Sequence, residues 1–342
     1  MVTGIVKDRR YLDHDMGAGH VESPRRLSAV YSLIEQGLPY PYVTIVPRPA
    51  RKEEIGYIHA PEYVEFVSST AGKPMIYLDP DTSTSSKSYD TALLAAGGAI
   101  KAADLIMDGE VKNGFALVRP PGHHAEFNQA RGFCIFNNIA VAAEHLVRRR
   151  DLKRILIADW DLHHGNGTQH AFYSRKDVLF FSTHQFPYYP GSGYRDEVGA
   201  GEGEGFTVNV PLSPGKGDSD YLFIYRKILG PIARAFKPEF ILVSAGFDIS
   251  KGDPLGGMRL TGAGFASLAA ELRGLASECC GGKILFILEG GYDLAGLAEG
   301  VKRVLDMLSG WGESPAGRAD ISISSEKELA PVVDIQKKYW PL

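Results

Sequence analysis

The sequence predicts an α/β protein with a mostly parallel central sheet and helices on both of its faces. Short runs that are apolar throughout alternate along the chain with longer helix-like segments. An apolar run without polar alternation is typical of a strand buried on both faces, and strand–helix alternation indicates a parallel sheet. With 342 residues, of which 44% are hydrophobic and 23% are charged, the chain is long and apolar enough for a large core.

Five strands and five helices are predicted from this alternation. The apolar runs predict strands at residues 115–118, 155–158, 178–181, 240–243 and 284–288. The segments between them predict helices at residues 89–108, 138–150, 221–236, 264–277 and 294–308. Residues 79–88 are rich in Ser, Thr and Asp, and residues 186–205 carry Pro, Tyr and Gly. Both segments are expected to be loops that wall a binding site.

Charge and cysteine content exclude several classes of protein. The net charge is −4, and the one basic cluster, residues 148–150, ends a predicted helix, where cations are favoured, so nucleic-acid binding is not expected. Three cysteines, two of them adjacent, suit no disulfide framework and favour a reducing cytoplasm. The first twenty residues hold no apolar stretch of signal-peptide length, and no segment approaches the length of a membrane span, so no membrane partner is expected.

Length alone would suggest two domains, but the candidate site argues for one. Its motifs are spread from residue 119 to residue 292, and most follow a predicted strand directly. Ligands bind beyond the carboxyl ends of the strands in open α/β sheets, so these motifs are expected to meet at one edge. We therefore expect a single domain over residues 1–342, with a core at about 14–308 and a C-terminal segment, 309–342, that docks on the body through Trp340.

Metal-binding side chains are unusually dense after the strand predicted at residues 155–158. Asp159, Asp161 and His163 alternate along the chain, so they project to one side of a backbone that is leaving a strand. Two carboxylates and an imidazole suit a borderline divalent ion such as zinc. Any one of these residues alone would fit a surface turn equally well, but the glycines that follow leave no packing role for so many polar groups.

A catalytic zinc centre has three protein ligands and one open position. Asp161 and His163 supply two ligands, and Asp248, at the end of the strand predicted at residues 240–243, is the best third. As an isolated residue, Asp248 would equally fit a helix cap or a turn. Asp159 is better placed to hold a histidine than to bind the metal.

Two histidines and a tyrosine are candidates for the chemistry. His123 and His124 follow Pro-Pro-Gly, a rigid turn that fixes both imidazoles in one place and can supply a general base and a general acid. Tyr292 follows two glycines at a strand end, which permit close approach of the backbone, and its phenol can donate to a developing oxyanion. Which histidine is the working base stays open, although His124 is favoured.

Five motifs together resemble the zinc-dependent histone deacetylase family, in order from about residue 14 to about residue 308. They are residues 120–124 (PPGHH), 132–134 (GFC), 159–167 (DWDLHHGNG), 246–254 (GFD with GDP) and 289–292 (EGGY). The resemblance implies the three-layer arginase/deacetylase fold, zinc ligands at Asp161, His163 and Asp248, and the transition-state phenol at Tyr292. It pairs His123 with Asp159 and His124 with Asn166. Asn166 is similar to class II members and their bacterial relatives, because class I members have aspartate there.

The same resemblance implies a narrow tube for the acyl-lysine stem and a structural potassium site. The positions matching the tube and its rim are Gly132, Phe133, Tyr189, Leu255 and Asp81. Asp79 competes with Asp81 for the rim position, and Tyr189 replaces the commoner phenylalanine, so its hydroxyl needs a partner. The positions matching the potassium site are Asp159, Asp161, His163, Ser182 and Thr183.

The favoured function is hydrolysis of N6-acyl-lysine in a peptide or protein by one zinc ion, or a ferrous ion, per chain. An acetylpolyamine amidohydrolase would share every catalytic residue and differ in the shape and charge of its entrance. A two-manganese ureohydrolase needs further carboxylates, and Ser250 stands where a second ligand would be required. A silent acyl-lysine-binding regulator should have lost a histidine, a ligand or the tyrosine, and none is missing. A homo-oligomer remains compatible with the sequence.

Overall fold

The computed structural model describes residues 2–312 and 323–342. Within these residues, eight strands form one sheet in the order β2-β1-β5-β10-β9-β6-β7-β8, and every neighbouring pair is parallel. The strands are β1 (Thr3–Val6), β2 (Tyr42–Ile45), β5 (Asn113–Ala116), β6 (Ile155–Asp159), β7 (Val178–Gln185), β8 (Thr207–Leu212), β9 (Phe240–Ala245) and β10 (Ile284–Leu288). The predicted parallel sheet is therefore confirmed.

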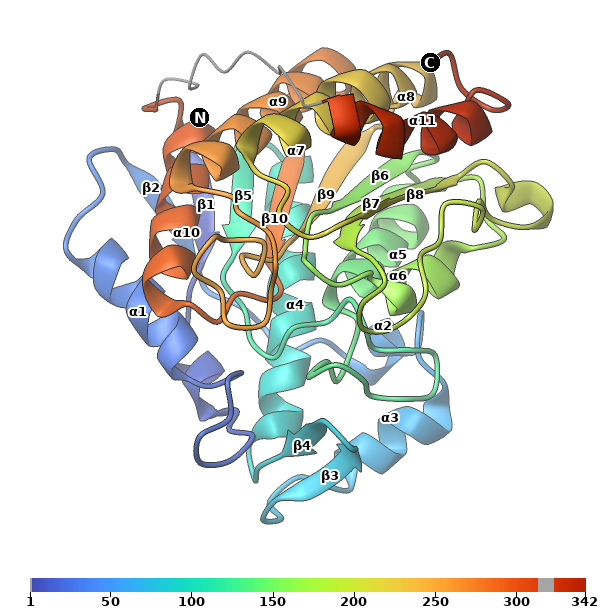
Figure 1. The fold of residues 1–342 in the computed structure, drawn as a ribbon. Coiled ribbons are helices and arrows are strands. Elements are labelled where there is room, and N and C mark those ends of the chain that lie inside the picture. The colour runs from blue at the N-terminus through green and yellow to red at the C-terminus, as the bar shows by residue number, and fades with distance from the viewer. Residues whose placement is uncertain (1, 313–322) are drawn as a thin grey trace.

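Helices surround the sheet (Figure 1). They are α1 (Arg25–Glu35), α2 (Lys52–Ile55), α3 (Pro61–Ser68), α4 (Ser88–Met107), α5 (Asn138–Arg150), α6 (Asn166–Phe172), α7 (Asp218–Ile224), α8 (Gly230–Phe236), α9 (Gly262–Cys280), α10 (Leu294–Ser309) and α11 (Ile323–Gln336). Helices α4 and α5 pack against each other and against the sheet, while α9 and α10 form a second packed pair with α1 and α7. The expected helical layers are thus present.

The five predicted strands and five predicted helices all exist, with small differences. Strand β5 begins two residues earlier than predicted, and the helix predicted at residues 221–236 consists of α7, a π-helical turn (Tyr225–Leu229) and α8. Strands β1, β2 and β8 were not predicted. Both β2 and β8 are edge strands. Strand β2 is largely exposed, whereas β8 is buried but contains the polar residues Thr207 and Asn209 and also Pro211, which an edge strand tolerates.

The segment predicted as a loop at residues 79–88 is partly regular. Strands β3 (Ile76–Asp79) and β4 (Thr82–Thr84) form an antiparallel hairpin apart from the main sheet. The turn between them carries Asp81, which lines the pocket described below. The prediction that this segment walls the site was right, whereas the expected absence of secondary structure was wrong.

Strand order explains why distant motifs meet. Strands β5, β10, β9 and β6 are consecutive neighbours, and the carboxyl ends of parallel strands lie at the same edge of a sheet. Asp159, the last residue of β6, is paired in register with Ser244 of β9. Chain segments leaving these four strands therefore begin side by side.

The C-terminal residues that the structure describes contact the body of the protein. The Trp340 indole Nε1 donates a hydrogen bond to the Gly205 carbonyl oxygen (2.8 Å), and its ring packs on Phe206 and Phe236. Residues 313–322 of the predicted docking segment lie outside the described residues. No helix among residues 2–312 and 323–342 is both long and apolar enough to cross a bilayer.

The arginine triplet ends α5, as predicted, and two of its members are in ion pairs. Arg148 pairs with Glu144, and Arg150 pairs with Asp104 and Asp108. Acidic partners therefore surround this short basic run.

Candidate metal and catalytic site

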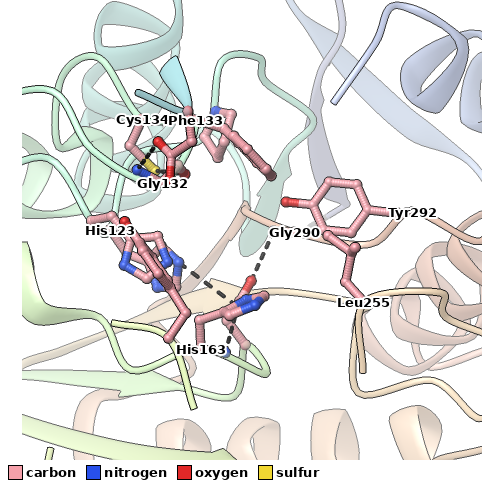
Figure 2. Close-up of a pocket in the computed structure, with 13 residues that line it drawn as sticks. His123, Gly132, Phe133, Cys134, His163, Leu255, Gly290 and Tyr292 are labelled. Carbon is pink, nitrogen blue, oxygen red and sulfur yellow. Dashed lines mark hydrogen bonds and ion pairs between the residues drawn. The ribbon is translucent and has the colours of Figure 1, made fainter. Parts of the chain in front are cut away.

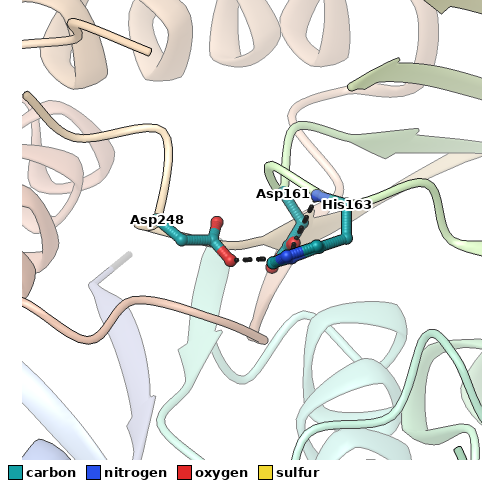
Figure 3. A group of neighbouring side chains, drawn as sticks. All are labelled: Asp161, His163 and Asp248. Carbon is teal, nitrogen blue, oxygen red and sulfur yellow. Dashed lines mark hydrogen bonds and ion pairs between the residues drawn. The ribbon is translucent and has the colours of Figure 1, made fainter. Parts of the chain in front are cut away.

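Asp161, His163 and Asp248 converge at the carboxyl ends of β6 and β9. One possible ligand atom from each lies within 4.8 Å of the other two, and the set is buried. The His163 Nδ1 atom is 3.1 Å from Asp161 Oδ1 and 3.3 Å from Asp248 Oδ2 (Figure 3). Among residues 2–312 and 323–342, this is the one group of three acidic, histidine or cysteine side chains with such spacing.

The surroundings of this group fit a bound cation. Asp248 Oδ2 is buried, and apart from the His163 contact at 3.3 Å, whose geometry is not that of a hydrogen bond, it has no hydrogen-bond partner among the residues that the structure describes. Burial and the nearby charge of Asp161 raise the pKa of Asp248 to about 7, which shows how poorly a second negative charge is compensated by the protein alone. A cation would supply that compensation.

Backbone amides hold the carboxylates in place. Asp161 accepts hydrogen bonds from the backbone N–H groups of His163 and Gly290 (both 2.9 Å), and Asp248 accepts one from Leu162 (2.9 Å). A Cβ atom at Gly290 would lie 2.2 Å from Asp248 Oδ2, so only glycine permits this approach. The sequence reading of Gly290 as a position of close backbone approach agrees with this contact.

His123 is surrounded by carboxylates. Its Nδ1 atom is 3.0 Å from Asp159 Oδ2, its Nε2 atom is 3.8 Å from Asp161 Oδ1, and its backbone N–H donates to Glu289 (3.2 Å). Burial favours the neutral imidazole, but the charges of Asp161 and Asp159 outweigh it and raise the pKa of His123 to about 10. Without a bound cation, these surroundings favour the protonated form of His123.

His124 has a neutral partner instead. Its Nδ1 atom is 2.7 Å from the Asn166 side-chain oxygen, at the first residue of α6. Burial and the positive charges on His123 and His163 hold the pKa of His124 well below its usual range. His124 is therefore a neutral imidazole with one ring nitrogen available to accept a proton.

Tyr292 lies on the opposite side of the same pocket, with its hydroxyl directed inward (Figure 2). Its ring meets Phe133 edge-on at a centroid distance of 5.9 Å, and the Arg26 guanidinium lies 5.0 Å from the ring centroid. Asp253 accepts hydrogen bonds from the backbone N–H groups of Tyr292 (2.6 Å) and Asp293 (3.1 Å). The ring contacts and the backbone hydrogen bonds together hold Tyr292 in place.

A fully buried ionic network supports the Tyr292 turn. Arg26 donates hydrogen bonds to the carbonyl oxygens of Gly291 (2.6 Å) and Glu289 (2.5 Å), and to the carboxylate of Glu22 (3.0 Å). Glu22 also accepts two hydrogen bonds from Arg119. The positive charge of Arg119 and the other contacts hold the pKa of Glu22 far below its usual range despite burial. The network joins α1 to the ends of β5 and β10.

The walls of the pocket include all five positions predicted for the substrate tube. They are Gly132, Phe133, Tyr189, Leu255 and Asp81. Phe133 has a φ of +69°, which is strained for a non-glycine residue and is typical of functional sites. The Tyr189 hydroxyl accepts a hydrogen bond from Arg131 Nε (3.3 Å), so the extra hydroxyl has its partner.

Asp81, and not Asp79, reaches the pocket. Its Oδ1 atom accepts hydrogen bonds from the Gly132 backbone N–H (3.0 Å) and from the Thr82 hydroxyl (2.9 Å). Of the positions predicted to hold potassium, Ser182 lies beside Asp159 in the β6–β7 register, and the Thr183 hydroxyl donates to the Asp159 carbonyl oxygen (3.4 Å).

Sequence reasoning missed the supporting residues, which include Glu22, Arg26, Arg119, Glu126, Arg131 and Glu289. All six are charged, and Arg119, Glu126 and Arg131 lie in segments that were interpreted only as flanks of a motif. Arg119 directly precedes the Pro-Pro-Gly motif and Glu289 is the first residue of the EGGY motif, so a charge directly after an apolar strand was the available signal. Arg26 and Glu22 carried no such signal.

Comparisons with known proteins agree with this geometry. Residues 20–308 match the family model of the histone deacetylase domain. The chain is 43% identical over 299 residues to a probable deacetylase of Archaeoglobus fulgidus, covering 86% of this chain and 83% of that protein. It is 41% identical over 353 residues to histone deacetylase 15 of Arabidopsis thaliana, covering 99% of this chain and 63% of that protein.

A human relative has a different named substrate. The polyamine deacetylase HDAC10 of Homo sapiens is 41% identical over 309 residues, covering 85% of this chain and 45% of that protein. The crystal structure of the HDA15 HD domain superposes with a TM-score of 0.93 at 41% identity, covering 100% of this chain and 97% of that one. The chain spans less than two thirds of the length of the full Arabidopsis and human relatives. Fold, site and comparisons agree: the chain belongs to the histone deacetylase family.

Proposed function

We propose that this chain is a zinc-dependent amidohydrolase that removes acetyl or other acyl groups from N6-acyl-lysine side chains. The observation that carries the proposal is a single pocket lined by Asp161 and His163 of the buried ligand group, a neutral histidine, His124, and an inward-directed phenol, Tyr292. These are the parts that metal-assisted amide hydrolysis requires.

Asp161, His163 and Asp248 would hold the ion, which, when bound, supplies Lewis acidity toward the amide carbonyl and a water molecule. His124 takes the proton from the attacking water, because it is the imidazole with a free lone pair, and this proton then passes to the lysine amine as the amide C–N bond breaks. His123, held protonated by Asp159 and Asp161, stabilises negative charge. The Tyr292 hydroxyl donates a hydrogen bond to the developing oxyanion.

The charges at the entrance favour an acyl-lysine over an acetylpolyamine. An acetylpolyamine carries a further ammonium group, whereas the stem of an acyl-lysine is apolar and uncharged. Arg131 sits beside the pocket wall, 5.6 Å from the Tyr189 ring centroid, and Leu255 adds an apolar wall. Asp81, the rim carboxylate, already accepts two hydrogen bonds. Outside the ligand group, Asp81 is the one carboxylate among the described residues that line the pocket, so the entrance offers little negative charge to the ammonium group of an acetylpolyamine.

A substrate panel tests the proposal. The protein is loaded with zinc or ferrous iron, its bound metal is quantified, and kcat/KM is measured for acetyl-lysine peptides, longer acyl-lysine peptides and acetylputrescine. We expect acetyl-lysine peptide to be the better substrate and about one metal ion per chain. Arg131→Glu should shift the ratio toward acetylputrescine, with Arg131→Gln as the uncharged control. Preference of the wild type for acetylputrescine would make the chain a polyamine deacetylase.

The structural potassium site, the single domain and the cytoplasmic location belong to the same proposal. A potassium ion bound by Asp159, Asp161, His163, Ser182 and Thr183 should make thermal stability depend on potassium at constant ionic strength. All three cysteines are free thiols, which supports a reducing compartment. Residues from Asp81 to Tyr292 line one pocket, which supports treating the chain as one domain.

A further inference from the structure

The hydrogen bonds that begin at His124 continue beyond Asn166 to the surface. The Asn166 amide nitrogen donates to Glu126 Oε1 and to the His124 carbonyl oxygen (3.3 Å). Both carboxylate oxygens of Glu126 lie 2.9 Å from Nδ1 of His170, which is on α6 and is 55% exposed. The mechanism above assigns no role to Glu126 or His170.

Glu126 determines which groups donate and which accept along this chain of hydrogen bonds. An ionised carboxylate only accepts hydrogen bonds, so Glu126 requires the NH₂ group of Asn166 to face it. The Asn166 oxygen must then face His124 Nδ1, which becomes a donor. In a neutral imidazole the proton on Nδ1 leaves the lone pair on Nε2. A reversed amide would place two acceptors in contact at Glu126.

Glu126 stays ionised because cationic and polar groups surround it. His170 contacts it from α6, Asn166 donates to it, and the positive charge of Arg131 lies near. Burial opposes ionisation, but these contacts outweigh it and lower the pKa of Glu126. The Glu126 backbone is fixed as well, since its N–H donates to the Gln129 carbonyl oxygen (2.9 Å) and its own carbonyl oxygen lies 2.8 Å from His59 Nδ1.

We propose that Glu126 is a positioning residue for deacetylation, which acts through the Asn166 amide to fix the Nδ1–H tautomer of His124. His123 needs no such device, because Asp159 contacts its Nδ1 directly and accepts only. The Asn166 amide could present either its oxygen or its nitrogen to His124, and the contact with Glu126 selects the oxygen. This inference rests on the proposed function only for the reaction that His124 serves, because the tautomer itself is a property of the folded protein.

The first test is Glu126→Gln, because glutamine presents both a donor and an acceptor and no longer selects one face of the amide. We expect kcat to fall by roughly 10- to 100-fold, the usual range for a residue that orients a working side chain, with KM little changed. Glu144→Gln is the matched control. Glu144 is also a buried carboxylate in ion pairs, with Arg148 and Arg175, but it is not linked to His124. Its replacement should leave kcat near that of the wild type.

The second test is a cycle with Asn166→Asp. A carboxylate at position 166 accepts from His124 Nδ1 whatever Glu126 does, and it repels Glu126. Glu126→Gln should therefore be harmful in the wild type and neutral or beneficial in the Asn166→Asp background. A merely structural role for Glu126 predicts the same loss in both backgrounds, and that result would overturn the inference.

The third test reads the tautomer without activity. In ¹⁵N-histidine-labelled protein, with the His124 signals assigned from the His124→Asn spectrum, we expect the Nδ1–H form in the wild type and a mixture in Glu126→Gln. An unchanged single tautomer together with unchanged kcat would refute the role of Glu126. Absence of wild-type activity on every acyl-lysine peptide would refute the proposed function instead, while this spectrum would still decide the tautomer.

Discussion

His123 and His124 are adjacent in sequence, with ring centroids 4.0 Å apart, yet they face two chemically different regions. His123 faces the carboxylate side of the site, formed by Asp159, Asp161 and Glu289 at the ends of β6 and β10. His124 faces the amide side, formed by Asn166 at the start of α6. The comparison shows that a buried ionic partner, more than backbone position, decides which histidine is charged.

The largest effect is expected from Asp161→Ala, which removes a group that both sides share. The variant loses a metal ligand and one of the charges that keeps His123 protonated. We expect loss of bound metal and of measurable activity, checked by elemental analysis and a peptide deacetylation assay. Asp151→Ala, at an exposed carboxylate, is the control. A metal-free but fully active Asp161→Ala protein would contradict the ligand assignment.

The next effect separates the two histidines directly. We expect His124→Asn to lower kcat by about 10³- to 10⁴-fold and His123→Asn by about 10²-fold, because loss of general acid–base catalysis spans this range and His124 is the neutral base. Single-turnover rates at matched metal content provide the measurement. A larger loss for His123→Asn would reverse the roles of the amide and carboxylate sides.

Tyr292→Phe tests the group that faces both histidines across the pocket. Loss of one oxyanion donor usually lowers kcat by about 10²- to 10³-fold. We expect this loss with little change in KM, because the ring contacts with Phe133 and Arg26 are kept. Steady-state kinetics of the metal-loaded variant, beside the wild type, would show it. Unchanged turnover would remove the phenol from the mechanism.

Interior and edge strands differ in how well the sequence alone predicts them. Strands β6, β7, β9 and β10 are interior strands with continuous apolar runs, so their position and the polar residues after them were readable. Edge strands β2 and β8 mix polar and apolar residues, so periodicity does not separate them from loops. Strand β1 is short and contains glycine, which weakens the signal although all four residues are buried.

The site shows the same division. The convergence of Asp161, His163 and Asp248 follows from residue type and from their places at strand ends, which a sequence displays. The buried network of Glu22, Arg26 and Arg119 does not, because a charged residue is normally interpreted as exposed and its partners are up to 265 positions away. Pairing of distant charges depends on the assembled sheet.

The smallest effect concerns the surface end of the amide side, where His170 contacts Glu126. The hydrogen bond that His170 donates to Glu126 raises the pKa of His170 above its ordinary 6.5, and the same contact lowers the pKa of Glu126 below its ordinary 4.5. The histidine contributes stability fully below pH 6.5 and loses it as pH rises through its folded pKa. The carboxylate contributes above pH 4.5 and loses it as pH falls through its folded pKa. The pair therefore stabilises the fold most between these two limits.

His170→Gln should accordingly lower the free energy of unfolding by less than about 1 kcal/mol near pH 5.5, because His170 is half exposed and solvent screens the pair. The difference from the wild type should shrink as the pH rises through the raised pKa of His170, so the variant and the wild type are compared at pH 5.5 and at pH 9. Urea unfolding of the chelated protein at the two pH values measures it. A difference that is equal at both values would mean that His170 acts through packing alone. The charge of His170 would then play no part in keeping Glu126 ionised.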